Sequence, residues 1–256
     1  DRYVVPFIGR TPIAEIKRAD LHMILDELSE QGKNITCNRT LAHMKRFFGW
    51  VVERGYLEHS PADHIKPRHH ETRRERILTD AEIKSVWESS DRLTPSYKAW
   101  VRLLFLCGQR ETETARIRCS QINDDIWELA STDTKNKRPS LVPLSTQAQT
   151  IINGLKHPEH NYLLTSGRIG DRPINGFGKT KNRIDEMSGV KEWTWHDIRA
   201  AVATNLAKLG YDRLLIKRVL NHKDSSITAI YDRYSYVDEN RDALQKWADK
   251  VDEITR

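Results

Sequence analysis

The 256-residue chain is poor in cysteine and has no long apolar segment. Its three cysteines, Cys37, Cys107 and Cys119, are odd in number and far apart. This excludes a disulfide framework and a cysteine-based zinc site, and it favours a reducing cytoplasm. No stretch approaches the ~18 consecutive apolar residues that a membrane span needs. The Gly-x-x-x-x-Gly-Lys-Ser/Thr phosphate loop is also missing, so ATP is not implied. These absences predict a soluble cytoplasmic protein.

The chain carries a modest excess of positive charge, +6 at pH 7, and 30% of its residues are charged. An excess of this size permits a polyanionic partner but does not demonstrate one. The chain begins at Asp1 without a signal-peptide pattern, which we interpret as a fragment or a processed chain. At about 150 residues per domain, the length predicts one large domain or two smaller ones.

Residues 1–65 are predicted to form a small helical domain. Apolar residues recur at helical spacing over 21–28 and again over 41–51. Thr36 or Asn38 is the predicted N-cap of the second helix. Residues 66–76 follow as a basic linker with almost nothing apolar to bury. Its charge serves either linker solubility or a strap across a phosphate backbone.

Residues 77–256 are predicted to form a second, larger domain. Residues 79–82 have the capping-box pattern, and the apolar run over 100–106 indicates a buried helix. The period then changes at 126–129 and 141–144, which predicts a β-hairpin with a basic tip. The predicted class is mainly α with a small β-hairpin or sheet, an α+β fold.

Several polar residues stand where the pattern predicts burial or a shared face. His196 and Arg199 are three apart and share one face of a helix, although such pairs are common on helix surfaces. Arg110 follows a buried helix and a glycine turn, so its guanidinium must find a polar partner. Glu113, one helical turn further on, is the predicted supporting acid.

Five motifs occur in the order GQR-ETE, a hairpin lysine, WHDIR, LNH and AIYDRYSY. In this order they resemble the tyrosine recombinase (phage integrase) family, and most of all the integrases of prophages and pathogenicity islands, which share the run YDRYSY…ALQKWAD. The resemblance covers nearly the whole chain. It implies a partial core-site DNA-binding domain in residues 1–65 and a catalytic domain in 77–256. It also implies that an N-terminal arm-binding domain is missing.

The resemblance assigns six catalytic positions, with the nucleophile last: Arg110, Lys135, His196, Arg199, His222 and Tyr231. Lys137 is the rival for the lysine, and Tyr234 and Tyr236 are rivals for the nucleophile. Tyr231 is favoured because it stands nine residues after His222, which is the family's spacing. Many members read Leu-Gly-His where this chain reads Leu-Asn-His, so Asn221 could alter the turn.

The function that the resemblance implies is site-specific DNA recombination through a 3′-phosphotyrosyl intermediate, integrating or excising a prophage or genomic island. The chemistry requires no metal and no other cofactor, because two guanidiniums stabilise the phosphate. The implied partners are double-stranded DNA at attachment sites and a homotetramer on paired sites, with a monomer expected without DNA. An excisionase and a host DNA-bending protein are possible further partners, in a bacterial cytoplasm at the nucleoid.

The remaining basic residues become candidate contacts to the DNA backbone, which position a protein without reading sequence. A solvated surface is the alternative for each. They are Arg39, Lys45, Arg46, Lys66, Arg68, Arg73, Arg74, Arg76, Lys179, Lys181 and Arg183.

Residues 238–251 place Leu244, Trp247, Ala248 and Val251 on one stripe of a predicted C-terminal helix. The stripe either packs within its own domain or docks onto a neighbouring protomer of a tetramer. We favour docking, because an exposed apolar stripe at a terminus needs a partner.

Two other functions stay open: a catalytically silent DNA-binding prophage relic, and DNA relaxation of the type IB topoisomerase kind. All six catalytic positions are filled, which argues against the relic. The predicted helical core-binding domain and the position of His196 favour a recombinase over a topoisomerase.

Overall fold

The computed structural model describes residues 2–71, 75–155, 160–166, 172–222 and 236–256. The chain divides into two compact units, residues 1–75 and 76–256, each with an apolar core of its own. None of the helices in the described ranges is long and apolar enough to span a membrane.

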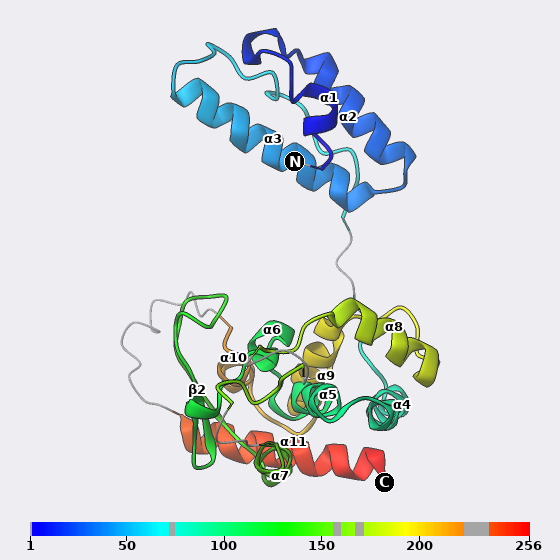
Figure 1. Cartoon of the computed structure of the whole chain (residues 1–256), viewed down its shortest axis with the longest axis vertical. Helices are drawn as coiled ribbons and strands as arrows, with labels where there is room; N and C mark the ends of the chain where they lie inside the picture. The colour runs from blue at the N-terminus through cyan, green and yellow to red at the C-terminus, as the bar shows by residue number, and fades with distance from the viewer. Residues whose placement is uncertain (1, 72–74, 156–159, 167–171, 223–235) are drawn as a thin grey trace. The chain divides into compact units, whose positions relative to one another are not determined.

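The first unit is helical (Figure 1). Its helices are α1 (Val5–Ile8), η1 (Ile13–Glu15), α2 (Arg18–Glu30) and α3 (Asn34–Glu53). Helices α2 and α3 pack against each other through side chains at helical spacing, such as Leu21, Leu25, Leu41 and Phe48, which are at most 2% exposed. The predicted helical domain is present.

Helix α3 begins earlier than predicted, with Lys33 rather than Thr36 or Asn38 as its N-cap. The Asn38 side chain has another use. Its amide donates to the carbonyl of His69 at 2.7 Å, and its oxygen accepts from the backbone of Arg68 at 3.2 Å. An Asn inside a helix can serve such a tertiary contact, which the local sequence does not reveal.

The basic segment 66–76, which ends the first unit and begins the second, is therefore not a solvated linker along its whole length. Arg68 forms an ion pair with Asp26, and the His69 ring bonds the hydroxyl of Ser29 at 2.9 Å. At the other end, Arg76 pairs with Glu82 of the second unit at 2.5 Å. Described residues on both sides of 72–74 are thus held by the unit to which they belong.

The second unit contains most of the helices. They are α4 (Asp80–Ser89), η2 (Ser90–Arg92), α5 (Pro95–Cys107), α6 (Glu111–Ala115), η3 (Cys119–Gln121), α7 (Thr146–Asn153), α8 (Phe177–Ser188), α9 (Trp195–Lys208), α10 (Arg213–Val219) and α11 (Val237–Thr255). The predicted capping box is confirmed, with the Glu82 backbone donating to Thr79 Oγ1 and the Thr79 backbone donating to the Glu82 carboxylate. Helix α5 contributes the largest share of the core, including Trp100 and Phe105.

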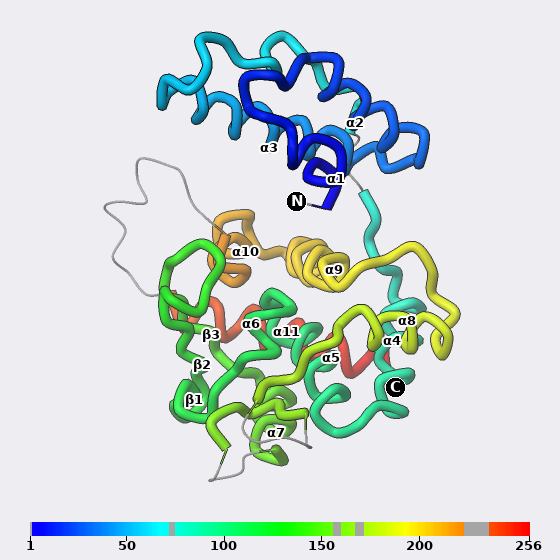
Figure 2. Tube along the Cα trace, turned by 45° about the horizontal axis from the view of Figure 1, so that its top comes forward, coloured from blue at the N-terminus to red at the C-terminus, as the bar shows by residue number. Residues whose placement is uncertain are grey.

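A small antiparallel sheet lies at the opposite end of this unit from α4 and α8 (Figure 2). Its strands, in spatial order, are β1 (Ile122–Asn123), β2 (Ile126–Leu129) and β3 (Ser140–Pro143). The predicted hairpin is confirmed, with Trp127 opposite Val142 and both side chains buried. Strand β1 was not predicted, because two residues carry no readable alternation. The α+β class is confirmed.

Helix α11 packs along the second unit against β3, α4, α5, α9 and α10 (Figure 1). Its apolar stripe is fully buried there: Leu244, Trp247, Ala248 and Val251 are at most 1% exposed. The Trp247 indole donates to the carbonyl of Phe105 at 2.7 Å. Our expectation that this stripe docks onto a neighbouring protomer is therefore wrong. The stripe packs on the apolar surface of α5 in the same unit, and no sequence pattern indicates that these two helices pair.

We expect Trp247→Ala to lower the free energy of unfolding of the second unit by about 3–5 kcal/mol, the usual cost of removing a buried Trp side chain. Denaturant unfolding followed by circular dichroism measures this. Lys246→Ala is the matched control on the same helix, since its exposed ion pair with Asp242 contributes at most about 1 kcal/mol. Unchanged stability in Trp247→Ala would contradict packing within the chain.

Candidate active site

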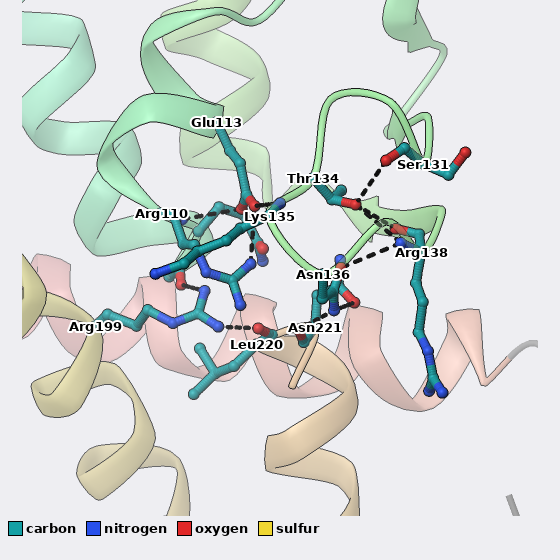
Figure 3. Close-up of polar contacts among 12 residues, drawn as sticks. Arg110, Glu113, Ser131, Thr134, Lys135, Asn136, Arg138, Arg199, Leu220 and Asn221 are labelled. Carbon is teal, nitrogen blue, oxygen red and sulfur yellow. Dashed lines mark hydrogen bonds and ion pairs between the residues drawn. The ribbon is translucent and has the colours of Figure 1, made fainter. Parts of the chain in front are cut away.

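The site is built around the buried guanidinium of Arg199 on α9 (Figure 3). The side chain is almost fully buried, and it donates from Nη1 to the carbonyl of Gly108 at 2.8 Å and from Nη2 to the carbonyl of Leu220. Its Nε is buried without a hydrogen-bond partner among the described residues. Burial, and next the charge of Arg110, lower the pKa of Arg199 to about 10, against the opposing effect of Glu113. The group is still a cation at neutral pH.

The turn that receives Arg199 requires a glycine. Gly108 ends α5 in the left-handed region, with φ +62°. A Cβ there would come within 3.0 Å of side-chain carbons of Leu220 and Val202. The next residue, Gln109, is buried and donates to the carbonyls of Cys107 and Val219, at 2.9 and 2.8 Å. The ends of α5 and α10 are thereby tied together.

Glu113 organises the opposite wall of the site (Figure 3). Its side chain is buried, and its Oε1 accepts from Arg110 Nη1 at 2.8 Å and from the backbone N–H of Lys135 at 3.2 Å. The predicted acid thus contacts both the first arginine and the hairpin lysine. One carboxylate orients the Arg110 fork and holds the turn that carries Lys135.

Four of the six predicted catalytic residues line one pocket of about 630 Å³: Arg110, Lys135, His196 and Arg199. They come from the start of α6, the β2–β3 turn and the first turn of α9. The rival Lys137 has a left-handed backbone, with φ +56°, and is not among the residues that line this pocket. Of the two lysines, only Lys135 shares the pocket with the arginines.

His222 follows α10 and lines a second pocket, of about 760 Å³, together with Arg218 and Tyr236. Partial burial is the largest cause that lowers its pKa to about 4, followed by the nearby cations Arg199 and Arg110. The ring is therefore neutral at pH 7 when no anion is bound.

The predicted nucleophile Tyr231 and its rival Tyr234 lie outside the described residues. The other rival, Tyr236, is described. It precedes α11 with a left-handed backbone, and its ring stacks on the Arg218 guanidinium, 3.4 Å from ring centre to Cζ.

Aromatic side chains also line the pocket that contains Arg110 and Arg199. Trp193 and Trp195 line it, with ring centres 5.1 Å apart, and Trp195 packs on Trp100 at 4.6 Å. Lys181, a predicted DNA contact, also lines the pocket, but its ammonium is 2.5 Å from the Asp185 carboxylate. Its charge is thus partly neutralised within the protein.

The other candidate DNA contacts have different surroundings. The exposed ones are Arg39, Lys45, Arg46, Lys66, Lys179 and Arg183. Arg68 and Arg76 are held in the ion pairs described above, and Arg73 and Arg74 lie outside the described residues. Within the second unit, Lys181 lines the pocket of the arginines, whereas Lys179 and Arg183 are not among its lining residues.

Sequence reasoning missed two polar residues of the site, Gln109 and Asn136, and it left open whether Asn221 alters the turn before His222. Gln109 had a readable signal, since it follows a buried apolar run directly, as Arg110 does. Asn221 adopts a left-handed backbone with φ +45°, a conformation in which Asn is the usual substitute for Gly. The Asn in the LNH motif therefore fits the turn, and its side chain is engaged by Asn136.

Comparison with known proteins gives one consistent answer. The sequence profile of the phage integrase family matches residues 76–237, and that of the phage integrase central domain matches residues 1–68. Tyrosine recombinase XerD of Listeria monocytogenes is 24% identical over 249 residues, covering 90% of this chain and 84% of the relative. Prophage integrase IntA of Escherichia coli is 23% identical over 261 residues, covering 98% and 63%.

Solved structures share the fold at low sequence identity. A lambda integrase dimer bound to a core site matches with a TM-score of 0.73 at 16% identity, over 88% of this chain and 86% of the other. The XerH recombinase bound to its difH substrate matches with a TM-score of 0.61 at 15% identity, over 92% and 73%.

We expect the His222 ring to titrate with a pKa of about 4 in the free protein, because it is partly desolvated and faces cations. Nuclear magnetic resonance of the ring protons measures this, with His222→Asn to assign the signal. Arg110→Met removes one repelling charge and should raise the pKa toward its ordinary value.

The same shift has a consequence for stability. Between pH about 6.5 and 4 the unfolded chain binds a proton at His222 that the folded chain does not, so acidification over this window destabilises the fold. A wild-type pKa near 6.5, or a pKa that Arg110→Met does not move, would contradict this assignment.

Proposed function

Because the chain belongs to the phage integrase family, and is therefore a tyrosine-type site-specific DNA recombinase, we propose that it integrates and excises a prophage or genomic island. One observation carries the chemical part of this proposal: Arg110, Lys135, His196 and Arg199 line a single pocket. The similarity to prophage integrase IntA of Escherichia coli supports the choice of a prophage or island. The first unit, residues 1–75, would bind the core site, and the second, residues 76–256, would carry out the chemistry.

The scissile phosphate would bind between the two arginines. Arg199 is fixed by the carbonyls of Gly108 and Leu220, and Arg110 by Glu113, so both guanidiniums are oriented before any DNA arrives. Charged donors fixed in this way stabilise the charge that develops on the non-bridging oxygens without reorganising during the reaction. The arrangement favours a phosphoryl-transfer step that relies on side chains.

The covalent step would be attack of the Tyr231 phenol oxygen on phosphorus. The new bond joins the tyrosine oxygen to phosphorus, the bond to the 5′-oxygen breaks, and a 3′-phosphotyrosyl link and a free 5′-hydroxyl result. The phenol has an ordinary pKa of about 10, so it needs a base. His222 is uncharged at neutral pH and, with His196, would assist removal of the phenol proton. Lys135 would donate a proton to the leaving 5′-oxygen.

The proposed DNA-binding face of the first unit lies on α3. Arg39 and Arg46 are exposed and seven residues apart, which is two helical turns, so they share a face. His43 and Trp50 are exposed and fall on the same face by this periodicity. A row of cations beside an aromatic side chain suits contact with a DNA backbone and its groove.

The solved relatives include a lambda integrase dimer on a core site and a lambda integrase tetramer on a Holliday junction. By analogy, the present chain would assemble as a tetramer on two paired attachment sites in the bacterial nucleoid, and be monomeric without DNA. An excisionase and a DNA-bending protein would set the direction of the reaction.

A nicked suicide DNA substrate that carries the candidate core site tests the chemistry. We expect the wild type to form a protein–DNA adduct that resists denaturant, and Tyr231→Phe to form none. An adduct that persists in Tyr231→Phe would move the nucleophile to Tyr234 or Tyr236. No adduct from the wild type, with DNA binding intact, would favour the silent relic.

We expect the double variant Arg39→Ala/Arg46→Ala to bind core-site DNA more weakly and to lower the slope of log affinity against log salt by about 2, at about 0.9 per lost phosphate contact. Fluorescence anisotropy at several salt concentrations measures both. Arg18→Ala is the matched control, since this exposed cation of the same unit lies on α2 and not on α3. An equal loss per charge in the control would contradict a DNA-binding face.

A further inference from the structure

Two asparagines connect the lysine turn to the histidine turn (Figure 3). Asn136 follows Lys135 in the β2–β3 turn, and its Nδ2 donates to both the backbone oxygen and the side-chain Oδ1 of Asn221, each at 2.9 Å. Asn221 stands between Leu220, whose carbonyl receives Arg199, and His222. A single side chain thus joins segments 85 residues apart in the sequence.

Hydrogen bonds within the turn around Asn136 hold it together, so a shift of Asn136 also shifts the backbone of Lys135. Thr134 Oγ1 donates to the carbonyl of Arg138 at 2.8 Å, and the Arg138 backbone N–H donates to Asn136 Oδ1 at 3.2 Å. On the other side, the Lys135 backbone N–H donates to Glu113. Glu113 and Asn136 therefore hold the lysine backbone from two directions.

The Lys135 side chain itself is exposed, and it forms no ion pair with an acid among the described residues. The position of its ammonium is then governed mainly by the position of the Lys135 backbone and by the walls of the pocket. A long side chain of this kind has a large rotamer freedom, so a backbone shift of the turn changes how often the ammonium reaches a given point.

We propose that Asn136, held by Asn221, is a positioning residue that sets Lys135 for proton donation to the leaving 5′-oxygen. This inference rests on the proposed function, and specifically on Lys135 as the proton donor. Asn221 serves two purposes in it: it adopts the left-handed backbone of the turn, and it supplies a second acceptor that a glycine would lack.

The test uses DNA in which sulfur replaces the 5′-bridging oxygen at the scissile phosphate. Attack by the tyrosine then breaks the phosphorus–sulfur bond, and the electron pair leaves on sulfur. A thiol has an ordinary pKa of about 8.5, far below that of an alcohol, so the thiolate needs no proton as it departs. A defect in proton donation therefore disappears on this substrate, whereas a defect in phosphate binding, in the nucleophile or in folding does not.

We expect Asn136→Ala to cleave ordinary DNA about 10- to 100-fold more slowly than the wild type at saturating protein in single turnover. This is less than the roughly 10²- to 10⁴-fold contribution of a complete general acid, because Lys135 is still present. On the sulfur substrate we expect its rate to lie within about 3-fold of the wild type. Asn221→Gly keeps the backbone acceptor and should lose less. The double variant should be no slower than Asn136→Ala, because the two residues act as one unit.

Asn123→Ala is the matched control. Its Nδ2 also donates within the sheet, to Glu128 at 2.8 Å, but it has no contact with the histidine turn among the hydrogen bonds of the described residues. We expect wild-type rates on both substrates. Lys135→Ala supplies the reference for complete loss of the donor, slow on ordinary DNA and restored by sulfur.

The outcomes distinguish a failure of the Lys135 assignment from a failure of the positioning role of Asn136. If Lys135→Ala is not restored by sulfur, the assignment of Lys135 in the proposed function fails, and this inference fails with it. If Lys135→Ala is restored but Asn136→Ala is equally slow on both substrates, or as fast as the wild type on both, the positioning role is overturned. Should Asn136→Ala not fold, the same comparison applies to Asn221→Gly.

Discussion

The structure of the site depends on one buried cation. Burying the Arg199 guanidinium is costly unless it finds acceptors, and the carbonyls of Gly108 and Leu220 accept from two of its three nitrogens. Those carbonyls lie at the ends of α5 and α10, while the arginine itself lies on α9. The Arg199 side chain therefore connects α5, α9 and α10. The other predicted catalytic residues that the structure describes lie beside the arginine and the two carbonyls that make this connection.

The site holds an excess of positive charge in the absence of a ligand. Burial first, and then repulsion by Arg199 and Arg110, lower the pKa of His222. Burial and then Arg110 lower the pKa of Arg199, while the buried Glu113 opposes this shift. Such repulsion is an electrostatic cost that an anion between the guanidiniums would relieve. Burial, together with these charges, keeps the neighbouring His222 in its neutral form, which suits a group that is to accept a proton.

Local features were readable from the sequence, and tertiary pairings were not. The capping box at Thr79 and the hairpin around Trp127 depend on near neighbours, and both were predicted. The start of α3 was misplaced because Asn38 binds a distant backbone, and the α11 stripe was misassigned because its partner, α5, is over 100 residues away in the sequence. The family resemblance named the predicted catalytic residues, but the contact of Asn136 with Asn221 joins segments 85 residues apart, and no motif in the sequence indicates it.

The tryptophans that line the pocket make its occupancy measurable by fluorescence. Trp193 and Trp195 line the pocket, and Trp195 packs on buried Trp100, so these indoles form a coupled group of chromophores next to the arginines. Indole emission responds to nearby charge and to the exclusion of water. The second unit thus contains intrinsic fluorophores beside Arg110 and Arg199, and binding of an anion in this pocket can be followed through their emission without a label on either molecule.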